Sequence, residues 1–299
     1  MTYSLDWTNL QAFIAVAEHG SLSAAVRAVG GSQPTMSRHI SALENELGVV
    51  LFERTSNGLM LTPTGTLLRE HANNMSEAAG KLLLAADGSS ETIEGTVRIT
   101  ASESVATYSL PPIITALRVA EPEIDIEMVA SDQTENLLLR EADIAIRMYR
   151  PTQADVFTKK IGEIESGMFA SHEYLAKRGI PETEADLFEH DFIGTDRDDA
   201  IIKGFRAHGL KIGRNDFPFR CDSQIVNWQL VLAGYGIGFT QLQVGESDPR
   251  VRRLFADRTM TKLPIWLTAH SELKTSLRVR RVFDFLAESF GASWKHQDI

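Results

Sequence analysis

Cysteine and long apolar runs are nearly absent from the sequence. The single cysteine, Cys221, cannot form a disulfide bond within the chain and cannot supply a CxxC metal site. No stretch approaches the roughly 18 consecutive apolar residues of a membrane-spanning helix. The first residues also lack the basic start and apolar core of a secretory signal. We therefore expect a cytoplasmic protein with no membrane partner.

Positive charge is also scarce. The chain has 30 Lys and Arg against 40 Asp and Glu, for a net charge of −10. This balance argues against a protein that coats nucleic acid through bulk charge, although a small DNA-reading module on an acidic body remains compatible with it. Residues 1–65 hold three arginines and five acidic residues, a local net charge of −2. If this segment binds DNA, paired half-sites and helix ends must supply most of the affinity.

Catalytic signatures are missing as well. The sequence contains no GxSxG, HExxH or P-loop motif, and no GxGxxG that opens a helix. The glycine cluster at 234–238 follows an expected helix and precedes an expected strand, which is the reverse of a dinucleotide loop. The histidines show no metal-ligand spacing. We expect no enzyme, no catalytic residue, no metal and no cofactor.

The segment 1–63 has the pattern of a winged helix-turn-helix. Apolar spacing predicts helices over 7–18 and 22–29, the second capped by Ser21. A third helix is expected to begin after Ser32 and to end at Gly48. The apolar stripe that should face the core of this small domain comprises Met36, Ile40, Leu43 and Leu47.

A β-hairpin is predicted to follow the third helix. Two short apolar runs flank the segment 55–58, and its Asn57-Gly58 pair is a strong hairpin signal. Helix, turn, helix and hairpin within some sixty residues describe a winged DNA-binding domain.

The segment 64–90 reads as a linker helix followed by a polar hinge. Its apolar residues alternate steps of four and three, which is the spacing of a coiled-coil seam. We expect this seam to pair two copies of the chain, with packing on the chain's own small domain as the alternative. The seam comprises Leu68, Ala72, Met75, Ala79, Leu82 and Ala86.

Residues 91–299 alternate strand and helix patterns, which predicts a parallel sheet with helices on both faces. Strands are expected at 95–101, 124–130, 142–148 and 264–270, among others, with a helix around 134–140. The expected domain has two α/β lobes with a cleft between them. One lobe comprises about 91–163 and 266–299, and the other about 164–265.

The segment 32–65, SQPTMSRHISALENELGVVLFERTSNGLMLTPTG, strongly resembles the LysR-type transcriptional regulators. The likeness continues through SLPP, EADIAIR and AGYGIGF, and so extends along the whole chain. The resemblance implies an α-helix-rich winged helix-turn-helix joined to a periplasmic-binding-protein-like effector domain. It also implies a homodimer or homotetramer that binds an inverted repeat in promoter DNA, with RNA polymerase as a further candidate partner.

Carried over by position, the resemblance places DNA-contacting residues on the third helix and on the wing. Glutamine can bond adenine in the major groove, and arginine can bond guanine or phosphate. The alternative for each single polar residue is a solvated surface position, and Ser32 is expected only to cap the helix. Two residues depart from the family pattern, Asn57 where arginine is frequent and Gly31 where a hydrophobic residue is expected. The expected DNA-binding residues are Gln33, Pro34, Thr35, Ser37, Arg38, Ser41, Arg54, Thr55, Ser56 and Asn57.

The effector is expected outside the carboxyl ends of the strands, where helix N-termini converge. Hydroxyls and main-chain N–H groups suit a small carboxylate, although Asp132 and Asp222 would oppose an anion. As alternatives, the hydroxyl residues cap helices, and Arg147 pairs with Asp143 or Glu163. The candidate effector-binding residues are Ser102, Ser104, Ser131, Asp132, Thr134, Arg147, Thr195, Asp222 and Ser223.

Two other functions fit parts of the sequence. A solute-binding protein would explain the lobes but requires export, and it leaves residues 1–90 unexplained. A regulator that needs no small effector is the second alternative. The sequence does not indicate which effector, operator or target genes are involved.

Overall fold

The computed structural model describes residues 5–55, 58–88, 92–132, 142–151, 155–197, 199–207, 212–257 and 260–295. The chain forms two compact units, Met1–Ala86 and Asp87–Ile299. Three predicted site residues, Ser56, Asn57 and Thr134, lie outside the described residues, as does the helix predicted around 134–140.

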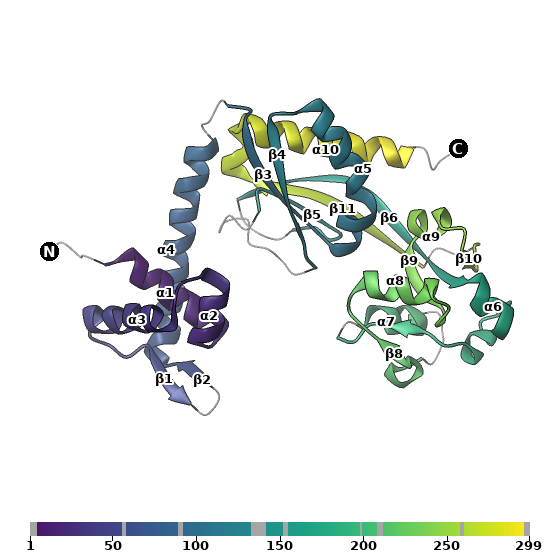
Figure 1. Cartoon of the computed structure of the whole chain (residues 1–299), viewed down its shortest axis with the longest axis horizontal. Helices are drawn as coiled ribbons and strands as arrows, with labels where there is room; N and C mark the ends of the chain where they lie inside the picture. The colour runs from purple at the N-terminus through teal and green to yellow at the C-terminus, as the bar shows by residue number, and fades with distance from the viewer. Residues whose placement is uncertain are drawn as a thin grey trace. The chain divides into compact units, whose positions relative to one another are not determined.

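The N-terminal unit has the predicted order of three helices and a hairpin (Figure 1). The predicted caps are confirmed, because the Ser21 Oγ accepts the Ala24 main-chain N–H at 3.2 Å and the Ser32 Oγ accepts that of Thr35 at 3.3 Å. Gly48 ends the third helix in the left-handed region, with φ of 69°. The elements are α1 (Trp7–His19), α2 (Leu22–Val29), α3 (Gln33–Leu47), β1 (Phe52–Thr55) and β2 (Gly58–Leu61).

A small apolar core holds these elements together. The Phe13 ring of α1 meets the Phe52 ring of the hairpin edge-to-face, with centroids 5.6 Å apart. Leu43 and Leu51 are fully buried in the same core. The prediction that Leu47 faces this core is wrong. Its side chain is 40% exposed, because it lies in the last turn of α3, where the chain turns away at Gly48.

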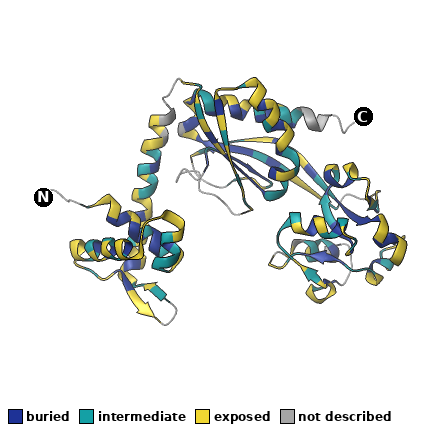
Figure 2. Ribbon diagram, in the orientation of Figure 1, coloured by how far each residue is buried: buried dark blue, intermediate teal, exposed yellow. Residues whose placement is uncertain are grey.

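The linker helix α4 (Pro63–Gly88) packs on the small domain only near its beginning. Ala72 is buried in the core of the small domain, and Leu68 packs against that core. Further along the helix, Met75 and Leu82 are 44% and 73% exposed. Figure 2 shows exposed positions along much of this helix.

No helix in the described part of the chain is both long and apolar enough to cross a membrane.

A seven-stranded sheet forms the framework of the C-terminal unit. Its order is β10-β6-β11-β5-β3-β4, and β9 pairs with β6. The predicted parallel sheet is confirmed for β3, β4 and β5 and is wrong for β6, β9, β10 and β11, which pair antiparallel. The strands are β3 (Gly95–Ala101), β4 (Ile124–Ala130), β5 (Ile144–Arg147), β6 (Val156–Ser171), β9 (Gly238–Gln241), β10 (Val251–Leu254) and β11 (Thr261–His270).

Two of these strands, β6 and β11, are long enough to connect two α/β lobes (Figure 1). In the first lobe, α10 packs on the sheet, where the Phe157 and Phe283 rings lie 4.8 Å apart. The register between β6 and β11 shifts at Ile265/Trp266, so that Ile265 faces Gly162 and Trp266 faces Lys160. This shift leaves Ile161 as an additional residue in β6.

The helices and a second small sheet complete the two lobes. A parallel pair, β7 (Ile193–Gly194) and β8 (Phe219–Arg220), lies in the second lobe. An aromatic cluster around Phe192, with Phe205 and Phe217, fills the core of that lobe. The helices are α5 (Leu110–Ala120), α6 (His172–Arg178), α7 (Ala200–Ala207), α8 (Gln224–Leu232), α9 (Leu242–Ser247) and α10 (Leu277–Lys295), with a π-helical turn η1 (Val105–Ser109) and 3-10 turns η3 (Asp186–Glu189), η4 (Arg214–Asp216) and η5 (Ser271–Thr275).

Candidate DNA-binding and effector-binding sites

A groove of about 430 Å³ lies between the two helices of the helix-turn-helix and the hairpin. It brings together residues that are far apart in the sequence, from α2, α3, β1 and β2. Five predicted DNA-contacting residues, Gln33, Ser37, Ser41, Arg54 and Thr55, line it. Pro34, Thr35 and Arg38 are exposed on α3 but do not belong to the lining.

The first turn of α3 presents polar groups to this groove. The Gln33 Nε2 donates a hydrogen bond to the Ser23 Oγ of α2 at 2.9 Å. The hydroxyls of Ser32 and Thr35 lie 2.9 Å apart, so Thr35 takes part in the cap of the helix. Ser23 was not predicted from the sequence, and its position in the first turn of α2 is the only signal that could have indicated it.

Glu44, near the end of α3, holds the start of the hairpin. Its Oε1 accepts the main-chain N–H groups of Leu51 at 2.7 Å and Phe52 at 3.3 Å. The hairpin therefore takes its position from the same helix that carries the polar face. Thr55 closes the hairpin, because its Oγ1 donates to the Gly58 carbonyl at 3.2 Å. This role of Glu44 was not predicted from the sequence.

The candidate effector residues of the first lobe follow three neighbouring parallel strands, β4, β3 and β5. Arg147 is only 5% exposed, and its guanidinium donates to the Thr100 Oγ1 at 2.9 Å. Ser102 is also 5% exposed, and its buried Oγ has no hydrogen-bond partner among the residues that the structure describes. Of the two carboxylates considered as partners of Arg147, Asp143 accepts the Arg98 main-chain N–H at 2.8 Å, and Glu163 pairs with Lys160 at 2.5 Å.

Asp132 lies after β4, close to these groups. Its Oδ1 accepts the Glu103 main-chain N–H at 3.2 Å. Desolvation nonetheless raises the pKa of the Asp132 carboxyl, while the charge of Arg147 acts in the opposite direction. Ser131, just before it, extends the strand through a main-chain hydrogen bond to the Ala101 carbonyl at 2.9 Å.

Two hydrogen bonds connect the lobes beside this group. The Ser223 Oγ donates to the Glu103 Oε2 at 3.0 Å, and the Gln241 Nε2 donates to the Ser104 Oγ at 3.1 Å. The alternative that Ser104 and Ser223 cap helices is wrong, because neither side chain makes a capping hydrogen bond. Both hydroxyls instead join the two lobes.

Asp222 organises the facing loop of the second lobe. Its Oδ1 accepts the main-chain N–H groups of Asp196 and Arg197, each at 2.9 Å, and its Oδ2 pairs with the Arg197 Nε at 2.7 Å. These hydrogen bonds lower the pKa of Asp222 to about 2, and the bond from the Arg197 main-chain N–H has the largest effect. Its charge is therefore compensated locally, and Thr195 is half-buried at the start of the same loop.

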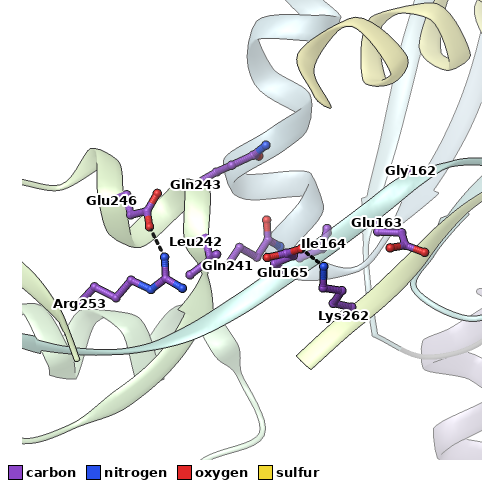
Figure 3. Close-up of a pocket in the computed structure, with 10 residues that line it drawn as sticks. All are labelled: Gly162, Glu163, Ile164, Glu165, Gln241, Leu242, Gln243, Glu246, Arg253 and Lys262. Atoms are coloured by element: carbon purple, nitrogen blue, oxygen red, sulfur yellow. Dashed lines mark hydrogen bonds and ion pairs between the residues drawn. The ribbon is translucent and has the colours of Figure 1, made fainter. Parts of the chain in front are cut away.

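A second pocket, of about 620 Å³, lies beside β6 and α9 (Figure 3). Four of its charged side chains pair with one another, Arg253 with Glu246 at 2.7 Å and Lys262 with Glu165 at 2.5 Å, while Glu163 pairs with Lys160 outside the lining. Gln241 lines this pocket as well as bonding Ser104. Within the described part of the chain, no group of three or more His, Cys, Asp or Glu side chains is placed to hold a metal ion.

A winged helix-turn-helix combined with a two-lobed α/β domain defines a DNA-binding transcriptional regulator whose activity is modulated by a small molecule. Comparison with protein families agrees with this class. Residues 7–66 match the bacterial regulatory helix-turn-helix of the LysR family, and residues 90–291 match the LysR substrate-binding domain. The chain belongs to the LysR family of transcriptional regulators.

Individual relatives cover nearly the whole chain. The transcriptional regulator CrgA of Neisseria meningitidis serogroup C is 27% identical over 293 residues, covering 94% of this chain and 96% of CrgA. The structure of CrgA from N. meningitidis superposes with a TM-score of 0.60 at 25% identity, over 96% and 100% of the two chains. The structure of the virulence activator AphB of Vibrio cholerae superposes with a TM-score of 0.64 at 21% identity, over 95% of this chain and 99% of AphB. That of CbnR complexed with its target DNA superposes with a TM-score of 0.60 at 23% identity, over 95% and 100% of the two chains, so both share the fold.

Proposed function

We propose that the chain binds an inverted repeat in promoter DNA as a homodimer, with α3 in the major groove and the hairpin beside it. The supporting observation is the groove that collects Gln33, Ser37, Ser41, Arg54 and Thr55 from two separate elements. Gln33 and Arg38 would contact base edges or phosphates, and the N-terminus of α3 adds N–H groups suited to phosphate. CbnR, a relative in fold, is known bound to its target DNA.

Removing two of these contacts tests the DNA-binding proposal. Fragments selected from the source genome by the full-length protein would supply the operator. Changing Gln33 and Arg38 together to alanine should weaken operator binding roughly 10³-fold, because a dimer loses four contacts of about 1 kcal/mol or more each. Arg280→Ala removes the same charge from an exposed position of the other unit and should leave binding unchanged. A folded double variant that binds like the wild type would disprove the proposal.

The dimer would form along α4. Leu68 and Ala72 are occupied by the small domain, so the surface open to a second copy is offset from the predicted seam. Met75 and Leu82 remain exposed, while Ala79 is half-buried and Ala86 exposed. Two helices pair along an apolar stripe at steps of four and three. The exposed stripe on α4 is apolar except for His71, and it comprises Leu67, His71, Met75, Ala78, Leu82 and Ala85. Two such dimers would pair to form a tetramer. The protein would act in the cytoplasm, where it would contact RNA polymerase.

The effector would be a small carboxylate bound where the two lobes meet. A buried guanidinium on Arg147, an unpartnered hydroxyl on Ser102 and the already compensated charge of Asp222 favour an anion there. Binding would change the hydrogen bonds that Glu103 and Ser104 make to the second lobe. The altered angle between lobes would then change the spacing of the two recognition helices.

A thermal-shift panel on the full chain tests the effector class. Acetate, succinate and benzoate would be compared with acetamide, succinamide and benzamide. A carboxylate at 100 times its Kd should stabilise the chain by about 2.7 kcal/mol, and its amide should not. Ser102→Ala removes an oxygen that has no partner within the described part of the chain, so it should keep the basal Tm and reduce only the shift. Equal shifts with acid and amide, or full shifts in both Ser102→Ala and Arg147→Met, would contradict the proposal.

A further inference from the structure

Ser23 and Gln33 form a polar pair across the turn of the helix-turn-helix. Ser23 is half-buried in the first turn of α2, and Gln33 is the exposed first residue of α3. The Gln33 Nε2 donates to the Ser23 Oγ at 2.9 Å. Both residues line the groove that also contains Arg54 of the hairpin. Ser23 does not cap α2, because Ser21 does so.

The direction of this hydrogen bond decides what each side chain can still offer. The Ser23 oxygen accepts from Gln33, so its own O–H remains to donate, and a DNA phosphate can only accept. The Gln33 amide retains its Oε1 acceptor and a second Nε2 hydrogen. These two groups match the N6 donor and N7 acceptor that adenine presents in the major groove.

We infer that Ser23 is a positioning residue that determines base specificity, since it orients the Gln33 amide for adenine while its hydroxyl donates to the neighbouring phosphate. This inference rests on the proposed contact of Gln33 with DNA. The terminal torsion of a glutamine is broad and roughly two-fold. Without the Ser23 oxygen, the amide of Gln33 rotates and presents its donor and acceptor in either order. Discrimination between bases then falls more than overall affinity.

Selection from random duplexes tests the role of Ser23. The full-length wild type, Ser23→Ala, Gln33→Ala and the matched pair Ser23→Thr and Ser23→Val would be compared. The wild type should prefer adenine at one position of each half-site, and Gln33→Ala should lose this preference. Ser23→Ala and Ser23→Val should lose roughly fivefold to tenfold of the discrimination, as expected for one hydrogen bond. Ser23→Thr, which keeps the hydroxyl, should retain it.

The outcomes separate this inference from the proposed function. If Gln33→Ala loses the adenine preference while Ser23→Ala and Ser23→Val keep it within twofold, the role of Ser23 is wrong and the DNA contact stands. If Ser23→Ala and Ser23→Val weaken binding to all duplexes equally and reduce its salt dependence, Ser23 contacts only phosphate and the inference also fails. If Gln33→Ala leaves every base preference intact, the proposed contact itself is wrong. Because the Thr and Val side chains have nearly the same shape, a folding defect would affect both.

Discussion

Gly65→Ala should cost the N-terminal unit about 1–3 kcal/mol of stability and at least tenfold in operator binding, as expected for overpacking against a rigid group. A Cβ at Gly65 would lie 2.2 Å from the main-chain oxygen of Leu51. Leu51 cannot retreat easily, because it is fully buried, its N–H is held by Glu44, and its carbonyl accepts the Thr62 N–H at 3.0 Å. The linker helix would therefore be displaced from the small domain.

Hydrogen exchange on the intact chain, followed by mass spectrometry, can measure this effect for each unit separately. Protection should fall over residues 5–55 and remain unchanged in the C-terminal unit. Gly204→Ala is the matched control, because a Cβ there meets no atom of the described residues around its helix within 4 Å. That helical substitution should be neutral or stabilising by up to about 1 kcal/mol. Normal protection and normal operator binding in Gly65→Ala would show that the close approach of α4 to Leu51 is unimportant.

Glu44→Ala should loosen the hairpin and leave α3 intact. The main-chain N–H groups of Leu51 and Phe52 lose their acceptor, and an unsatisfied buried donor costs about 1–3 kcal/mol. Exchange over residues 49–55 should accelerate, and operator binding should fall because Arg54 and Thr55 are no longer held beside α3. Glu44→Gln keeps an acceptor oxygen and should lose less.

Glu46→Ala provides the control for this change. Glu46 is an exposed carboxylate on the same helix, so its removal alters the charge by the same amount without touching the hairpin. Since less negative charge near DNA strengthens binding in general, Glu46→Ala should bind at least as well as the wild type. Equal exchange over 49–55 in Glu44→Ala and Glu46→Ala would contradict the role assigned to Glu44.

The N-terminal unit was largely predictable because its signals are local. Ser21 and Ser32 cap the helices that follow them. The Asn57-Gly58 pair predicted a hairpin, and its two strands, β1 and β2, pair antiparallel in the structure. Each of these signals depends on a few consecutive residues. The prediction for Leu47 was wrong because helical spacing does not show that the last turn of α3 extends beyond the apolar core.

The C-terminal unit was less predictable because its decisive features are long-range. The local β-α-β rhythm indicated β3, β4 and β5. No local pattern showed that β6 pairs antiparallel with β11, or that β10 pairs antiparallel with β6. Ser223 was predicted to bind the effector, with helix capping as the alternative, whereas its hydroxyl bonds Glu103, which lies 120 positions earlier. Ser23 was overlooked for the same reason, since its partner Gln33 belongs to another helix.

The additional residue Ile161 in β6 has a mechanical consequence. The hydrogen-bonded ladder between β6 and β11 continues on both sides of it, so neither lobe can slide past the other without breaking many main-chain bonds. The pairing is weakest at the register shift opposite Ile265/Trp266, and bulged strands bend most readily there. Any relative rotation of the lobes would thus be a small-angle flexing of a two-stranded ribbon about this point, which would leave the packing inside each lobe undisturbed.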